Sequence, residues 1–439
     1  MAEHIKIIIP IISLCREIPR LMVRRIMKAI KGGFLIDANG VRQKPVVLFE
    51  GERIVEVGST GSVSIPSDAE VIDARDFFLM PGLVDCHVHF TGSDVGGPIN
   101  FRESYENRLI RAAVHQTKQL LDAGFTSVMD AGGLIGLHVR NAVNEGIVSG
   151  PRVVAAGRYM SVTGGHGDTH YLPMEWVKEG RPFGWGMDGR IADGVDECIR
   201  AVREQLREGV DFIKICTSGG GGSLRDPPNI PEYTLEELEA MVHIAHSWGR
   251  RVMVHCYNPE GIKRSVTAGA DIVAHGNMAD EASIRLMKEH GTVVVPTMSV
   301  YHRMARLRAQ EGSTQPSQDR VRSMYSTLFE DVKRLHDGEL TLAAGTDTMG
   351  GTLPFGGNAL ELELYVERVG LSPLEAIKIS TLNGARAMGL EGSLGTLEAG
   401  KLADIIAVGE SPLENIKSLQ EKSNIKLVIK GGEVLKNIL

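Results

Sequence analysis

Residues 81–90 read PGLVDCHVHF, and the apolar run that this stretch contains predicts a buried strand. Leu83 and Val84 begin the run, and His87 and His89 follow it two positions apart. Because side chains alternate between the two faces of a strand, both imidazoles point to the same side. One face of the expected strand therefore ends in two imidazoles.

Seven further apolar segments predict short strands, and helical patterns lie between several of them. Helix starts are indicated by two capping boxes, Thr234 with Glu237 and Ser372 with Glu375. Strands that alternate with helices favour a parallel α/β fold, and eight of them predict a (β/α)₈ TIM barrel. The seven segments are residues 125–131, 152–157, 211–220, 251–256, 271–277, 292–299 and 341–347.

The residues on either side of this region have a different pattern. Residues 33–80 read as short strands and turns, and residues 395–410 and 426–435 have the same character. We expect the two distant pieces to form one small β-sandwich domain, made of residues 27–80 and 393–439. The barrel would then occupy residues 81–392.

Residues 1–26 precede both expected domains. They contain the apolar stretch IKIIIPIISLC followed by basic residues, without a small-residue cleavage site. One interpretation is a loose or mis-started extension, with Met22 or Met27 as the true start. A cleaved signal or a surface anchor is the alternative.

Composition excludes several classes of protein. The 439 residues are 43% hydrophobic and 23% charged with a formal net charge of −7, which is typical of a globular protein and disfavours nucleic acid as a partner. No apolar run approaches the roughly 18 residues of a membrane span, so we expect no stable membrane insertion. Five widely spaced cysteines without a CxxC pair indicate no disulfide framework and favour a reducing, cytoplasmic location.

The carboxyl ends of the expected strands carry an unusual set of side chains. In a barrel of this kind the active site lies at those ends, so side chains from distant segments would converge there. Taken singly, each could be an ordinary core, rim or turn residue, but their joint placement favours a site. The set comprises His87, His89, Lys214, His255, His275 and Asp347.

Imidazoles together with a carboxylate suit zinc and related divalent metals, and a catalytic centre leaves one coordination position open for water. Lys214 does not fit this set as an ammonium, because a buried cation beside metal ions would be repelled and desolvated. A neutral amine that captures carbon dioxide becomes a carbamate, whose two oxygens can bridge two metals. Lys214 could instead extend its head to the barrel rim, and Asp347 could be a turn residue.

Six motifs together resemble the metal-dependent amidohydrolase superfamily, in the branch of imidazolonepropionase-like peptidases and Xaa-Pro dipeptidases. The resemblance runs from about Gly33 to the end of the chain. The motifs are PGLVDCHVHF, DFIKICTSGG, VMVHCY, IVAHGN, AAGTD and GTLEAGKLADIIAV.

The resemblance implies a binuclear zinc centre. One metal would be held by His87, His89 and Asp347 and the other by His255 and His275, with N6-carboxylysine at Lys214 and a hydroxide as bridges. Imidazolonepropionases proper lack the bridging lysine, so the comparison favours the peptidase side. In the related dipeptidases, positions that match His166 and Tyr233 contact the free carboxylate of the substrate.

These observations predict a hydrolase of an amide bond, acting on a small-molecule or dipeptide substrate. We expect a dipeptide of the Xaa-Pro or Xaa-Arg/Lys type or an N-acyl amino acid, with Asp347 taking the proton of the attacking hydroxide. We also expect a homo-oligomer. Two alternatives stay open: an enzyme for cyclic amides, carbamates or xenobiotic amides of the ochratoxin type, and a non-catalytic assembly protein. The second would have lost metal ligands, and none is missing here.

Overall fold

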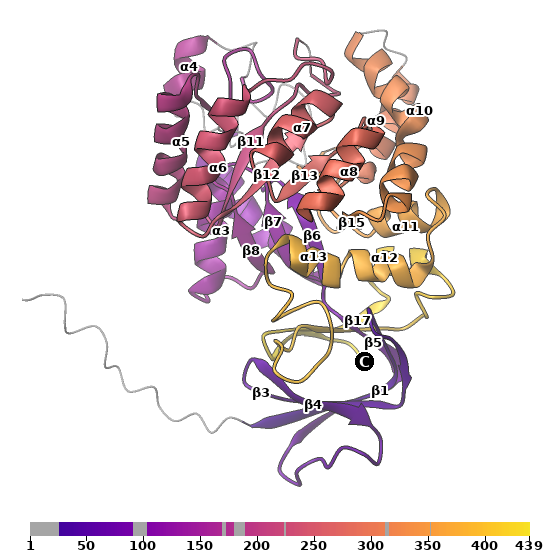
Figure 1. Cartoon of the computed structure of the whole chain (residues 1–439). Helices are drawn as coiled ribbons and strands as arrows, with labels where there is room; N and C mark the ends of the chain where they lie inside the picture. The colour runs from indigo at the N-terminus through magenta and orange to yellow at the C-terminus, as the bar shows by residue number, and fades with distance from the viewer. Residues whose placement is uncertain are drawn as a thin grey trace, which may run out of the picture.

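The computed structural model describes residues 26–90, 103–168, 173–179, 189–223, 225–311, 316–351 and 353–439. The expected N-terminal extension therefore lies outside the described residues, apart from Ile26. The fold is α/β, with a larger part of parallel strands and helices above a smaller part of strands (Figure 1).

Parallel strands form the centre of the larger part. Nearly every position in them is buried, as expected for strands that are covered on both faces. One sheet has the order β6 (Leu83–Val88), β7 (Phe125–Asp130), β8 (Arg152–Ala155). The other has the order β10 (Gly189–Ile191), β9 (Tyr159–Ser161), β11 (Phe212–Cys216), β12 (Arg251–Cys256), β13 (Ile272–His275), β14 (Val293–Val295), β15 (Thr341–Leu342).

Backbone hydrogen bonds connect the two sheets at both of their junctions. Only three residues separate β8 from β9, and the Asp211 amide, just before β11, donates to the Ala155 carbonyl at 2.9 Å. At the other junction, the Cys86 amide of β6 donates to the Ala344 carbonyl at 2.8 Å, and Val88 forms a parallel bridge with Thr348. The parallel series that begins with β6 thus returns to β6 after β15.

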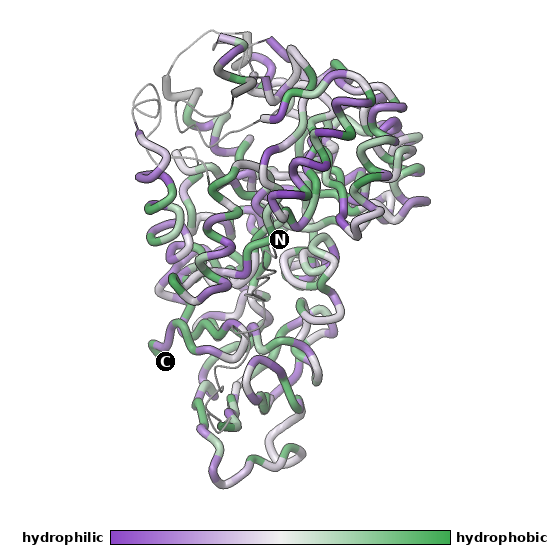
Figure 2. Tube along the Cα trace, turned by 90° about the vertical axis from the view of Figure 1, so that its left-hand side faces the viewer, coloured by the Kyte–Doolittle hydropathy of each residue, from purple (hydrophilic) through white to green (hydrophobic). Residues whose placement is uncertain are grey.

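The helices cover the outside of the parallel strands (Figure 1). Figure 2 shows polar and apolar residues alternating along them, as expected for helices with one buried face. Both predicted capping boxes are confirmed, at the start of α6 and of α12. The helices are α1 (Tyr105–Ile110), η2 (Arg111–Gln116), α2 (Thr117–Asp122), α3 (Leu134–Asn144), α4 (Met174–Glu179), α5 (Val195–Glu208), α6 (Leu235–Ser247), α7 (Pro259–Thr267), α8 (Glu281–His290), α9 (Met298–Glu311), α10 (Pro316–Asp337), α11 (Leu360–Glu367), α12 (Pro373–Ile379), α13 (Leu382–Ala387) and η3 (Ile416–Gln420).

Strands from both ends of the chain share the smaller part. Here β16 pairs antiparallel with β5, placing Ile405 opposite Pro81, and apolar side chains of β1, β3, β5, β16 and β17 form a separate core. Seven of the eight strands follow one hydrogen-bonded path, β18-β17-β16-β5-β1-β3-β4, and β2 pairs with β1 beside this path. The eight strands are β1 (Met27–Asp37), β2 (Gly40–Gln43), β3 (Pro45–Glu50), β4 (Arg53–Ser59), β5 (Glu70–Pro81), β16 (Ile405–Val408), β17 (Ile425–Lys430) and β18 (Glu433–Asn437).

A single residue, Gly82, connects the smaller sheet to the first parallel strand. Its amide donates to the Asp404 carbonyl at 3.0 Å, and a Cβ at this position would lie 2.0 Å from the Thr126 hydroxyl. Only glycine therefore allows β5 to continue into β6. This close approach helps to fix the strand that carries His87.

The last parallel strand is shorter than the sequence predicts. Residues 341–347 were expected to form it, but β15 ends at Leu342. Beyond that point the chain moves from β14 to β6, where the Asp347 amide donates to the His87 carbonyl at 2.7 Å. Among the described residues, no helix is both long and apolar enough to cross a membrane.

Candidate metal centre

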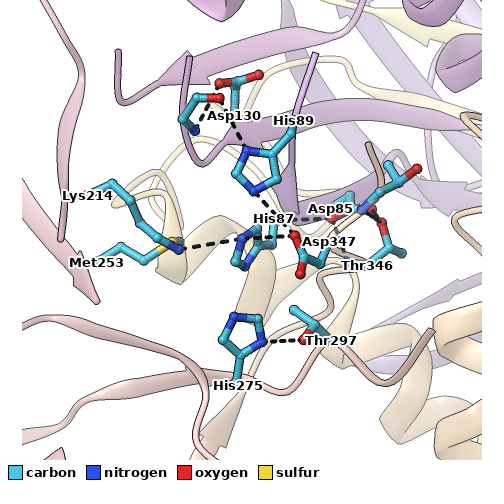
Figure 3. Close-up of polar contacts among 12 residues, drawn as sticks. Asp85, His87, His89, Asp130, Lys214, Met253, His275, Thr297, Thr346 and Asp347 are labelled. Atoms are coloured by element: carbon cyan, nitrogen blue, oxygen red, sulfur yellow. Dashed lines mark hydrogen bonds and ion pairs between the residues drawn. The ribbon is translucent and has the colours of Figure 1, made fainter. Parts of the chain in front are cut away.

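Six side chains predicted from the sequence lie together where the parallel strands end. Figure 3 shows five of them, all except His255. Nε2 of His87 and Nε2 of His89 lie 3.4 and 3.3 Å from the same Asp347 oxygen. The donor atoms of these three residues all lie within 4.8 Å of one another. This is the geometry of a group that can surround one metal ion.

The other two histidines adjoin this group. The His275 ring centroid lies 5.3 Å from that of His87 and 4.5 Å from that of His255. Nδ1 of His275 is 2.7 Å from the Thr297 hydroxyl, so Nε2 is the atom left for a ligand. A partner of this kind on the second ring nitrogen is usual for metal-binding histidines.

Lys214 extends into the same group from β11. Its side chain is only 3% exposed, and Nζ lies 3.5 Å from Nε2 of His87 and 3.6 Å from the Met253 sulfur. No carboxylate of a described residue forms an ion pair with it. Burial lowers the pKa of Lys214 to about 8. A buried amine without an anionic partner fits conversion to a carbamate better than a permanent ammonium.

Burial also sets the protonation of most of the histidines. It lowers the pKa of His87 and of His255 well below the usual range and that of His275 to about 3. Burial alone would lower the pKa of His89 too, but the hydrogen bond to Asp347 raises it. Burial thus favours the neutral imidazole at His87, His255 and His275, and neutral imidazoles beside a carboxylate are a donor set that suits divalent metals.

Two aspartates that the sequence prediction did not include hold the first strand in place. Asp85 accepts hydrogen bonds from the His87 amide at 3.0 Å and from the Thr346 hydroxyl at 2.7 Å, and also from Asn358. It thereby links the strand end bearing His87 to the turn bearing Asp347. Burial raises the pKa of Asp85 to about 6 despite these hydrogen bonds.

Asp130 holds the backbone on both sides of His89. Its carboxylate accepts from the amides of Phe90 and Gly132 at 2.9 and 3.1 Å. The Gly132 carbonyl lies 3.2 Å from Nδ1 of His89. Because a carbonyl can only accept, a proton belongs on Nδ1, and Nε2 is the nitrogen directed toward Asp347.

Three residues of the cluster have left-handed backbone conformations without being glycine. The φ angles are 72° at His275, 53° at Thr297 and 55° at Asp347. Such conformations cost roughly 1–3 kcal/mol each and persist only where the surroundings enforce them. Strain of this kind is concentrated here on turns that carry or support candidate ligands.

His166, for which the resemblance implies contact with the substrate, lies beside the cluster. Its ring stacks on His255 with the centroids 4.0 Å apart, and Nδ1 lies 3.0 Å from Asp226 and 3.1 Å from the Ser223 hydroxyl. Burial would raise the pKa of Asp226, but the hydrogen bonds from His166 and its neighbours lower it to about 2. The stacked ring therefore adjoins an ionised carboxylate.

Tyr233 is placed differently from His166. It is 1% exposed, and its hydroxyl has no hydrogen-bond partner among the described residues. Its neighbour Glu232, which the sequence prediction did not include, accepts a hydrogen bond from the His166 amide at 2.6 Å. Burial raises the pKa of Glu232 to about 9. Glu232 rather than Tyr233 is thus in direct contact with the segment that carries His166.

Comparisons with known proteins show the family to which this chain is related. The model of the amidohydrolase family matches residues 78–435. Ochratoxinase of Aspergillus niger is 36% identical over 425 residues, covering 93% of this chain and 86% of that protein. A crystal structure of A. niger ochratoxinase superposes with a TM-score of 0.85 at 33% identity, covering 94% of this chain and 96% of that one. A Xaa-Pro dipeptidase with methionine bound in its active site superposes with a TM-score of 0.83 at 31% identity, covering 94% and 100%.

Proposed function

The chain belongs to the amidohydrolase family and is a hydrolase of carbon–nitrogen bonds, and we propose that its substrate is a dipeptide or N-acyl amino acid with a free carboxylate. The observation that carries the proposal is the convergence of four histidines, Lys214 and Asp347 in one buried group. His166, which stacks on one of these histidines, supports recognition of a carboxylate nearby.

We propose that the two parallel sheets close into a (β/α)₈ barrel, with β8 and β9 as two parts of one strand. The hydrogen bonds at both junctions support this closure. The barrel would span residues 81–392, and residues 27–80 and 393–439 would form the β-sandwich domain. The four described cysteines are free, which supports a reducing, cytoplasmic location, and a homo-oligomer remains part of the proposal.

The side chains fit two divalent cations, for which zinc is the proposed metal. When bound, such cations would lower the pKa of a water molecule and polarise the carbonyl to be cleaved. His87, His89 and Asp347 would hold one, His255 and His275 the other, and carboxylated Lys214 would be shared.

Asp347 is the proposed acid–base group. Its carboxylate lies beside the imidazoles of His87 and His89. Burial would raise the pKa of Asp347, but the hydrogen bond with His89 and the nearby His89, His275 and Lys214 lower it. An ionised carboxylate in this position can accept the proton of the attacking water and donate it to the leaving nitrogen. His166, and with lower geometric support Tyr233, would hold the substrate.

A second candidate function is hydrolysis of a xenobiotic amide, a cyclic amide or a carbamate. The 36% identity to ochratoxinase is the observation that favours it. The same donor group would serve both reactions, since a fold and its site fix the chemistry more closely than the substrate.

A substrate panel tests the proposal. The full chain, reconstituted separately with zinc and manganese, is assayed against Xaa-Pro and Xaa-Arg dipeptides, N-acyl amino acids, aryl amides, cyclic imides and carbamates. We expect the highest kcat/KM for a substrate with a free carboxylate. Preferential cleavage of cyclic imides or carbamates would support the second candidate, and no cleavage of any amide, ester or lactam would overturn both.

A further inference from the structure

Helix α10 reaches the glycine-rich loop of residues 218–223 through one arginine. Nη2 of Arg320 donates a hydrogen bond to the Ser223 carbonyl. The Arg320 side chain is half-buried, and its Nε is buried without a hydrogen-bond partner among the described residues. No carboxylate in the described part of the chain forms an ion pair with it. The hydrogen-bonding capacity of this guanidinium is therefore only partly used, and no anion of the described residues balances its charge.

The loop that Arg320 contacts forms part of the wall of the candidate site. The Ser223 hydroxyl lies 3.1 Å from Nδ1 of His166, and the Gly219 carbonyl lies 3.3 Å from Nε2 of His255. A Cβ at Gly220 would lie 2.3 Å from the His166 ring, so the loop packs directly on that histidine. Ser223 therefore contacts Arg320 through its carbonyl and His166 through its hydroxyl.

The face of α10 that carries Arg320 is turned toward this loop over more than one helical turn. Met324 follows Arg320 by four positions, and a Cβ at Gly221 would lie 2.7 Å from its sulfur. The same Cβ would lie 2.8 Å from the Tyr301 hydroxyl of α9. The guanidinium is thus held beside the loop by close packing of two helices.

The charged groups around His166 and its neighbouring loop are two acids, of which one is ionised, and Arg320. Asp226 is ionised, because the hydrogen bonds from His166 and its neighbours lower its pKa to about 2 despite burial. Burial keeps Glu232 neutral at pH 7 by raising its pKa to about 9. Arg320, by contrast, is always cationic. Arg225, which follows this loop by two positions, is exposed to solvent.

We propose that Arg320 is a specificity-determining residue whose guanidinium binds the free carboxylate of the substrate on the side of the loop next to His166. This inference rests on the proposed function and deepens it. It assigns the preference for acidic substrates to a residue of α10, 97 positions from Ser223 in the sequence. Arginine suits this role because its donors can engage both oxygens of a carboxylate.

Paired substrates and matched variants test the inference. Each N-acyl amino acid is compared with its carboxamide, which keeps the scissile bond but loses the negative charge. The variants are Arg320→Met and Arg320→Lys, and Arg322→Met is the control, since it removes one charge from an exposed position of the same helix. Arg225→Met removes the other nearby cation. Melting temperatures of all variants verify folding.

We expect Arg320→Met to raise KM for the acid by roughly tenfold to a hundredfold, with little change in kcat and none for the carboxamide. Arg320→Lys should recover part of the loss, and Arg322→Met should behave as wild type. An equal effect on acid and carboxamide would overturn the inference, as would a larger effect of Arg225→Met.

A binding measurement separates failure of this inference from failure of the proposed function. Free L-proline and L-phenylalanine, and their amides, are titrated into wild type and Arg320→Met by calorimetry. If wild type hydrolyses nothing, the proposed function fails, yet weaker binding of the acids to the variant still supports Arg320. Equal binding of acids to both proteins overturns the role of Arg320 whatever the hydrolysis result.

Discussion

Nζ of Lys214 lies 3.5 Å from Nε2 of His87, and the environment of each lowers its pKa, chiefly through burial. Two nitrogens at this distance cannot both carry a positive charge without strong repulsion. Lys214, whose pKa is about 8, therefore has an accessible neutral amine under mildly alkaline conditions. That amine is the form that reacts with carbon dioxide.

Lys214→Ala should lower the metal content from about two ions per chain to about one and abolish most of the activity, because one shared ligand is lost. Metal analysis after gel filtration measures the first effect. Acetate or formate should restore part of the activity by occupying the space of the carbamate. Lys430→Met, at a lysine that donates to the Gly150 carbonyl, is the control and should keep full metal content. Unchanged metal content in Lys214→Ala would contradict the bridging role.

Asp347→Asn should lower kcat by roughly 10²–10⁴-fold, because the amide cannot accept the proton that the carboxylate takes. We expect KM to change little. Metal content must be measured in parallel, since Asp347 is also a proposed ligand. Asp331→Asn, which changes a partly buried carboxylate on α10, is the control. A variant that keeps both its metal and its kcat would contradict the acid–base assignment.

Glu232→Gln should change how stability depends on pH. Burial raises the pKa of Glu232 from 4.5 to about 9, so the fold favours the neutral carboxyl. The contribution of this group to the free energy of unfolding is complete below the unfolded-state pKa and is lost as the pH rises toward 9. Glutamine does not ionise and keeps an oxygen for the His166 amide. The variant should therefore gain stability relative to wild type with rising pH.

Urea unfolding at a series of pH values measures this difference. Parallel stability curves for wild type and Glu232→Gln would show that Glu232 is ionised in the fold. Glu232→Ala removes the acceptor of the His166 amide altogether, so it should raise KM for acidic substrates while the glutamine variant stays close to wild type.

Tyr233→Phe should raise stability and impair function together. The Tyr233 hydroxyl is buried without a partner among the described residues, and an unsatisfied buried hydroxyl costs roughly 1–3 kcal/mol. Removing it should therefore raise the melting temperature of the free enzyme. If the hydroxyl contacts substrate, KM should also increase. A variant that is more stable than wild type and has an unchanged KM would contradict the substrate-binding role of Tyr233.

The sequence predicts that the four histidines, Lys214 and Asp347 lie together, because the carboxyl ends of parallel strands meet at one edge of the sheet. His255 and His275 each end a strand with a clear apolar run, so their proximity follows from the fold alone. The two capping boxes are equally local signals, since each is formed within four residues.

The supporting contacts could not be predicted in this way. Asp85 meets Thr346 across 261 positions, and Arg320 meets Ser223 across 97, with no periodicity to relate them. Strands β9 and β10 are only three residues long, too short for an alternating pattern to appear. Of these, Asp85 alone had a sequence signal, as a carboxylate within the PGLVDCHVHF run.

The left-handed turns at His275, Thr297 and Asp347 have a practical consequence for anyone who handles this enzyme. Glycine would relieve the backbone strain at each turn, but it would also remove a metal ligand or a side chain that supports one. Substitution by glycine therefore cannot be used to stabilise the protein at these positions. Cations that bind only the folded chain would offset the strain by mass action. Shelf life should then depend on the trace-metal supply of the culture, and a chelating purification buffer would shorten it even when activity can later be restored.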